Sequence, residues 1–273
     1  MANATTGYAD IGDAKLYYEI AGEGETLVLS HAGFVDSRMW DDQWDEFAQH
    51  YHVIRFDMRG YGKSDLAKAP VSRRKDLYGF LKVLNVERAH LLGCSMSGEV
   101  IIDFALEHPE MVASLIPVSA VPSGFQLQGA PPPELLEMMN AVNQHDLARA
   151  SDLQIRIWVD GPSRQPEQVN PQVRQRAAVM NKISVENGTW AADAQPLDPL
   201  NPPAAGRLKA LQVPTLVIAG ALDNPEILRA ADVLASEISG AKKIIIPDAA
   251  HVPNMDKPAE FNRAVLSFLQ GLE

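Results

Sequence analysis

The chain has 273 residues, and its 46% hydrophobic and 22% charged content fits one large globular domain with an insertion better than two independent domains. Its net charge of −11 argues against nucleic acid as a partner, because phosphates require a basic patch on the protein. The single cysteine permits no intramolecular disulfide, and residues 1–12 do not have the pattern of a secretion signal. No apolar run is long enough to span a membrane. We therefore expect a cytoplasmic protein that binds neither nucleic acid nor membrane.

Strand and helix patterns alternate along most of the chain. Residues 8–20 are predicted to form two strands joined by a tight turn at Gly12-Asp13. Six apolar runs typical of strands buried on both faces follow, at residues 26–30, 53–56, 90–92, 114–118, 215–219 and 243–246. Helical patterns lie between them, at residues 74–84, 100–107, 225–238 and 259–269. The order predicts an α/β fold with a doubly wound, mostly parallel sheet and an N-terminal antiparallel hairpin. The basic residues 73–75 are expected on a solvated face.

This alternation stops between residues 121 and 206, a stretch that is rich in proline. Two amphipathic segments lie within it, at residues 134–143 and 172–183, and its apolar content is too high for a disordered linker. We interpret the stretch as a helical cap inserted after the sixth predicted strand. The predicted organisation is a core domain of residues 1–120 and 207–273 and a cap of residues 121–206.

The most informative stretch is L-L-G-C-S-M-S-G at residues 91–98, where a predicted buried strand ends and a helix begins. A serine at such a sharp turn exposes its hydroxyl, and the helix N-terminus can stabilise negative charge beside it. The turn needs small residues two places before and after Ser95; Gly93 meets this need, and Ser97 replaces the usual glycine. On this motif alone, Ser95 could equally cap the helix. Cys94 is expected to be a small buried hydrophobe rather than a nucleophile.

Three further segments follow predicted strands. The sequence H-A-G-F occupies residues 31–34, D-M-R-G-Y-G-K-S occupies residues 57–64, and Asp223 and His251 stand in the loops after the last two strands. Together with the serine turn, these segments resemble the α/β-hydrolase fold family. The resemblance is to its serine-nucleophile branch, which includes 3-oxoadipate enol-lactonases and small-ester carboxylesterases. It covers the predicted core and is weak across the cap.

The resemblance implies a catalytic triad with Ser95 as nucleophile, His251 as base and Asp223 as the acid, in the chain order expected for this fold. It also implies an oxyanion hole built by the amides of Gly33 and Met96, because attack on a carbonyl creates an oxyanion that fixed dipoles must stabilise. Taken singly, Asp223 could cap the next helix and His251 could be a surface residue. The order of the four segments favours catalysis.

Other side chains are assigned supporting roles. Phe34, Trp158 and Met138 are expected to line the substrate pocket. The second of the three segments is assigned a structural role, in which Asp57 and Arg59 form a local charge-assisted network.

Three other positions are considered for the acid of the triad. Asp248 is too near His251 in the same short loop, and Asp198 lies within the proline-rich insertion. Some relatives carry the acid after the preceding core strand, where this sequence has Ser119. Asp223 is therefore preferred.

We expect the protein to hydrolyse a small carboxylic ester or lactone through an acyl-enzyme, without a metal or organic cofactor. The seven histidines show no metal-ligand spacing. Two other chemistries share the triad. Cofactor-free perhydrolases usually carry tryptophan and proline where this chain has Gly33 and Phe34, and carbon–carbon hydrolases often carry tryptophan where it has Val252. A small-molecule receptor of the same fold is a further alternative, because some keep the G-x-S-x-S turn.

Overall fold

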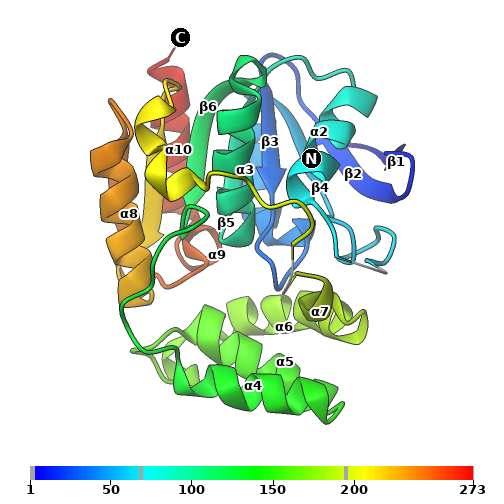
Figure 1. Cartoon of the computed structure of the whole chain (residues 1–273), viewed down its shortest axis with the longest axis vertical. Coiled ribbons are helices and arrows are strands. Elements are labelled where there is room, and N and C mark those ends of the chain that lie inside the picture. The colour runs from blue at the N-terminus through cyan, green and yellow to red at the C-terminus, as the bar shows by residue number, and fades with distance from the viewer. Residues whose placement is uncertain (1–3, 68–69, 194–195, 273) are drawn as a thin grey trace.

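The computed structural model describes residues 4–67, 70–193 and 196–272. Eight strands form one sheet in the order β1-β2-β4-β3-β5-β6-β7-β8 (Figure 1). Their bounds are β1 Thr5–Asp10, β2 Lys15–Ala21, β3 Thr26–Ser30, β4 His52–Phe56, β5 Ala89–Cys94, β6 Val112–Val118, β7 Leu216–Gly220 and β8 Lys242–Ile246. β2 is antiparallel to β1 and to β4, and the other neighbours are parallel. The predicted mostly parallel sheet with an N-terminal hairpin is confirmed.

Burial explains why the inner strands have continuous apolar sequences. Every residue of β5 and β7 is buried, because helices cover both faces of the sheet at these positions. β8 is an edge strand, and its exposed Lys242 and Lys243 suit a strand with one unpaired side.

Helices pack on both faces of the sheet (Figure 1). α2, α3 and α8 share one apolar core, in which Phe80, Phe104 and Leu234 are fully buried. α1, α9 and α10 share the core on the other face, which includes Phe47 and Phe261.

The α-helices of the described chain are α1 Asp41–Phe47, α2 Arg73–Val83, α3 Met96–Glu107, α4 Pro133–Asn143, α5 Leu147–Ile155, α6 Pro171–Glu186, α7 Thr189–Asp193, α8 Pro225–Glu237, α9 Pro253–Asp256 and α10 Pro258–Gln270. The short helical turns are η1 Ser37–Trp40, η2 Pro109–Met111, η3 Arg156–Asp160, η4 Pro166–Gln168, η5 Ala204–Gly206 and η6 Leu208–Ala210.

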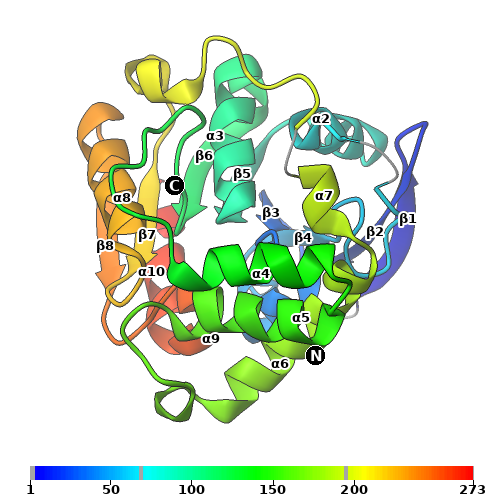
Figure 2. The ribbon, with the colours of Figure 1, turned by 60° about the horizontal axis from the view of Figure 1, so that its bottom comes forward.

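The helices α4 to α7 lie between β6 and β7 in the chain and beyond one end of the sheet in space (Figures 1 and 2). They are therefore an insertion after the sixth strand, as predicted. A small apolar cluster joins α4, α5 and α6 to each other, while Val173, Ala177 and Met180 of α6 belong to the core of the sheet. The division into a core of residues 1–120 and 207–273 and a cap of residues 121–206 stays a prediction.

One expectation about local structure is wrong. Residues 73–75 do not form a solvated face, because Arg73 and Arg74 are only 8% exposed and pair with Asp193 and Glu107. Both partners are far away in the sequence, so no local pattern indicates them.

The end of β7 depends on Gly220, because a Cβ at this position would overlap the carbonyl oxygens of Ala249 and Ala250. We expect Gly220→Ala to lower the free energy of unfolding by about 2 kcal/mol, the cost typical of an overpacked interior. Urea unfolding checks this. Gly206→Ala is the matched control, since a Cβ there meets nothing within 4 Å. Equal stabilities of the two variants would contradict the expected clash.

Candidate active site

Ser95 occupies the sharp turn between β5 and α3. Its φ of 57° and ψ of −118° are strained for a residue other than glycine. Its amide donates to the carbonyl of Val118 on β6 at 2.8 Å, which fixes the turn to the sheet. A Cβ at Gly93 would lie 2.5 Å from the carbonyl oxygen of Ser97, so the turn requires glycine there. The side chain of Ser95 makes no capping hydrogen bond to α3, so the helix-cap alternative is wrong.

Ser95, His251 and Asp223 form one hydrogen-bonded chain. Asp223 follows β7 and His251 follows β8, and the parallel pairing of these strands brings both loops to the same edge of the sheet. The Oγ of Ser95 lies 2.8 Å from Nε2 of His251. Nδ1 of His251 lies 2.9 Å from Oδ2 and 3.1 Å from Oδ1 of Asp223. His251 is 1% exposed and Asp223 is 6% exposed, so both are shielded from water.

The carboxylate determines the tautomer of His251. An ionised carboxylate only accepts hydrogen bonds, so Nδ1 of His251 carries the proton that faces Asp223. Nε2 is then unprotonated and accepts a hydrogen bond from the hydroxyl of Ser95. The arrangement can remove the proton of Ser95.

Two of the three predicted pocket residues lie beside this chain. The indole of Trp158 packs on the imidazole of His251, with ring centroids 5.0 Å apart, and lies 6.4 Å from the ring of Phe34. Trp158 belongs to η3, a π-helical segment that directly continues α5. Such segments are common at functional sites, because the extra residue per turn redirects side chains.

Gly33 and Met96 are neighbours in space. A Cβ at Gly33 would lie 3.1 to 3.3 Å from side-chain atoms of Met96, so the two residues adjoin. Among the residues that the structure describes, neither amide donates to a protein acceptor. The carbonyl of Gly33 lies 2.7 Å from the hydroxyl of Tyr61, whose single proton is shared between this carbonyl and Oδ2 of Asp193 at 2.6 Å.

His31 anchors the start of the same loop. Its Nε2 accepts from the amide of Met58 at 2.9 Å, which leaves the proton on Nδ1 to be donated to the carbonyl of Ala32 at 2.9 Å. Complete burial lowers the pKa of His31, although Asp57 opposes this effect. The imidazole is therefore a neutral clamp rather than a base.

The expected network between Asp57 and Arg59 is wrong. The carboxylate of Asp57 accepts from the amides of Ser37 and Lys63, and so holds two loops together. The guanidinium of Arg59 is largely buried and pairs instead with Asp13 and Asp76. Backbone donors satisfy Asp57, so it needs no cation.

The rival residues lie in other surroundings. The carboxylate of Asp248 is 80% exposed with Lys257 at 3.8 Å, and Asp198 pairs with Lys75 at 2.7 Å. Cys94 is fully buried, as expected, and its sulfur faces the carbonyl of His251. Burial raises the pKa of the Cys94 thiol, and Asp223 raises it further, so the reactive thiolate is disfavoured.

Two cavities adjoin the site. One of about 250 Å³ lies beside Gly33, between the core and the cap, and its walls include Gln154 and Trp190. Another of about 430 Å³ is lined by Trp158 and Asp223. Met138, the third predicted pocket residue, is fully buried in the apolar cluster inside the cap. Its role as a pocket residue stays a prediction.

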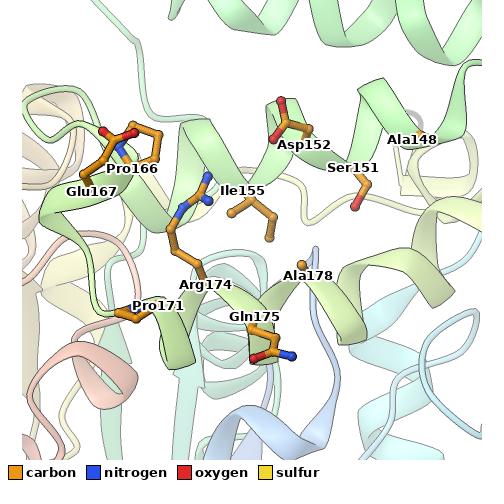
Figure 3. Close-up of a pocket in the computed structure, with 10 residues that line it drawn as sticks. All are labelled: Ala148, Ser151, Asp152, Ile155, Pro166, Glu167, Pro171, Arg174, Gln175 and Ala178. Atoms are coloured by element: carbon orange, nitrogen blue, oxygen red, sulfur yellow. The ribbon is translucent and has the colours of Figure 1, made fainter.

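A third hollow, of about 520 Å³, lies between α5 and α6 within the cap (Figure 3). Its walls include Asp152, Glu167 and Arg174, and Arg174 is already paired with the buried Asp160. The hollow contains no member of the Ser95 chain and belongs to the architecture of the cap.

Arg164 of the cap binds the loop that carries His251. Its guanidinium donates to the carbonyls of Val159 and Asp160 at the end of η3, and to Oδ2 of Asp256 at 2.9 Å. The same Oδ2 accepts from the amide of Ala250, the residue before His251. Arg164 therefore links the segment of Trp158 to the loop of His251. Sequence reasoning missed this contact because its partners lie 92 positions apart.

Within residues 4–67, 70–193 and 196–272, no cluster of three or more histidine, cysteine or acidic side chains is arranged to hold a metal ion. In the same part of the chain, no helix combines the length and the apolar character that crossing a membrane requires.

Comparison with known proteins agrees with this fold. Residues 25–258 match the alpha/beta hydrolase fold family, so the chain belongs to that family. It is 26% identical to the 2-hydroxy-6-oxo-6-phenylhexa-2,4-dienoate hydrolase of Comamonas testosteroni, over 96% of this chain and 93% of that protein. It is 29% identical to the pimeloyl-[acyl-carrier protein] methyl ester esterase of Pectobacterium carotovorum subsp. carotovorum strain PC1, over 94% and 99%. The chain is therefore a hydrolase of this family.

A solved structure shows the same fold. The enol-lactonase from Burkholderia xenovorans LB400 superposes with a TM-score of 0.79, at 24% identity, over 97% of this chain and 100% of that one. At this identity the likeness shows the fold alone.

Removing Arg164 should strongly destabilise the fold. Arg164→Ala leaves the carboxylate of Asp256, which is only 4% exposed, without its cation, so we expect the free energy of unfolding to fall by about 3 kcal/mol. Arg149→Ala is the control, because its exposed pairs with Glu137 and Asp152 are screened by solvent and should matter little. Urea unfolding of both variants checks this. A lower free energy of unfolding in Arg149→Ala but not in Arg164→Ala would contradict the role of Arg164 in holding the loop of His251.

Proposed function

We propose that the protein is a serine hydrolase that cleaves a small carboxylic ester or lactone through an acyl-enzyme. The observation that carries the proposal is the hydrogen-bonded chain from Asp223 through His251 to Ser95, placed on a strained strand-to-helix turn. Nucleophile, base and orienting acid are the three parts that acyl transfer by a serine requires.

In the proposed reaction, Oγ of Ser95 attacks the acyl carbonyl while Nε2 of His251 takes its proton. The amides of Gly33 and Met96 stabilise the oxyanion. The carbonyl re-forms, the bond to the alcohol oxygen breaks, and the alcohol leaves with the proton from His251. Water then attacks the acyl-enzyme in the same way, which releases the acid and restores Ser95. Asp223 stabilises the imidazolium in both halves.

The cavity beside Gly33 favours a neutral group over an anionic one. A dienoate carries a carboxylate, and a buried carboxylate needs a cation or several donors. The described wall of this cavity includes Glu186 and neither lysine nor arginine, whereas the cavity lined by Trp158 and Asp223 includes Arg156, so the carboxylate of a dienoate would have to lie there. The relative named as a dienoate hydrolase nevertheless makes carbon–carbon hydrolysis by the same triad the second candidate. A cytoplasmic location stays a prediction that is compatible with the single cysteine.

A panel of nitrophenyl esters, lactones and an oxo-dienoate, assayed with Ser95→Ala, tests the proposal. We expect turnover of an ester or lactone, and a loss of about a thousandfold or more in Ser95→Ala, because the nucleophile is gone. Ser236→Ala, a change at an exposed serine of α8, should leave the rate unchanged.

The same panel separates the alternatives. Turnover of the oxo-dienoate alone would favour carbon–carbon hydrolysis. A single covalent event without turnover would favour a receptor. Ester turnover that persists in Ser95→Ala would contradict the proposed nucleophile.

The acid is tested by one matched pair of variants. Asp223→Asn should fold but lose about 10⁴-fold in kcat, because an amide cannot stabilise the imidazolium or hold the required tautomer. Asp248→Asn makes the same chemical change in an exposed side chain near His251 and should alter kcat little. Steady-state kinetics with one ester measure both. A reversed order would assign the role of the acid to Asp248.

A further inference from the structure

Ser97 stands where the serine turn usually carries glycine, and its hydroxyl makes two hydrogen bonds. Ser97 is fully buried at the start of α3. Its Oγ donates to the carbonyl of His31 at 2.5 Å and accepts from Oγ of Ser30 at 2.9 Å. Ser30 is the last residue of β3 and is 3% exposed. A buried hydroxyl must be hydrogen-bonded, and both of these bonds connect α3 to the end of β3 and the loop that follows it.

The bond from Ser97 joins the two segments that carry the proposed oxyanion donors. Ser97 follows Met96 directly, and His31 lies two residues before Gly33. The other described contact between these donors is the apolar side chain of Met96 against Gly33, which resists compression but not separation. The hydrogen bond from Ser97 to His31 is directional and opposes separation.

Other contacts of the loop do not reach α3. The imidazole of His31 is fixed to the amide of Met58, and the carbonyl of Gly33 lies near the hydroxyl of Tyr61. Without the hydroxyl of Ser97, these contacts and the pairing of Ser30 with Gly93 still keep the loop folded, but the direct hydrogen bond between α3 and the backbone of His31 is lost. An oxyanion hole requires both donors within about 0.5 Å of the working geometry.

We propose that Ser97 is a positioning residue that sets the spacing between the oxyanion-hole amides of Gly33 and Met96. The inference rests on the proposed serine hydrolase function and adds a residue to its machinery. Ser97 acts through the two backbone segments and does not touch the substrate.

The test compares Ser97→Ala and Ser97→Gly with Ser30→Ala. The first two remove the bond to the carbonyl of His31, whereas Ser30→Ala removes the neighbouring hydroxyl and leaves that bond in place. Three quantities are measured for each variant: kcat and KM for a nitrophenyl ester, the inhibition constant of a trifluoromethyl ketone, and the melting temperature. The ketone adds to the nucleophilic serine and places an oxyanion in the hole, so its affinity reports on the hole directly.

We expect both Ser97 variants to lose about tenfold to a hundredfold in kcat, less than the loss of a whole oxyanion donor, with KM within about twofold. The inhibition constant of the ketone should rise by the same factor as kcat falls. Ser30→Ala should change kcat by less than about threefold. If Ser97→Ala does not fold, Ser97→Gly, which restores the usual residue of the turn, decides the matter.

A Ser97 variant that melts at a lower temperature but keeps kcat and ketone affinity would overturn the inference and leave Ser97 a structural residue. Equal kinetic losses in Ser30→Ala and Ser97→Ala would overturn it as well, because the bond to His31 would then not be the cause. Both results leave the proposed function standing. A wild-type protein that turns over no ester, or does so without Ser95, overturns the proposed function and this inference together.

Discussion

The hydrogen bond between Asp223 and Nδ1 of His251 is the interaction on which the site depends. It forces the imidazole to present an unprotonated Nε2 to Ser95, 2.8 Å away, so the direction of proton transfer is set before any substrate arrives. Its strength comes from burial, because water that reached the pair would compete for both partners. The sheet makes this burial possible, since the neighbouring strands β7 and β8 end at the same edge.

The core and the cap hold the same histidine from different sides. β8 and its loop place His251 beside Asp223, while Trp158 of η3 packs on its ring. Arg164 binds the carbonyls of η3 and the carboxylate of Asp256, which accepts from the amide before His251. A displacement of the cap would therefore move the imidazole of His251. The cap has its own apolar cluster and also shares part of the core of the sheet through α6.

Much of the fold could be predicted from the sequence, because each buried strand is a short run of apolar residues. The run at residues 26–30 coincides with β3, and the turn at Ser95 requires glycine at position 93 for a steric reason that a motif can express. The proximity of Ser95, Asp223 and His251 was implied by the resemblance of their segments to the family. Features set by distant partners could not be predicted: Asp57 binds two backbone amides rather than Arg59, and Arg73 is buried against Asp193. The use of the Ser97 hydroxyl likewise needed the position of His31 in space.

Mapping the site of a fluorophosphonate adduct shows whether Ser95 is the nucleophile, because the probe reacts with a serine whose proton a neighbouring base removes. We expect one adduct per native chain, located on Ser95 by peptide mass spectrometry, and loss of labelling when the chain is unfolded in urea or carries His251→Ala. An adduct on Cys94 or Ser97, or labelling of Ser95 that is equally fast in the unfolded chain, would contradict that role.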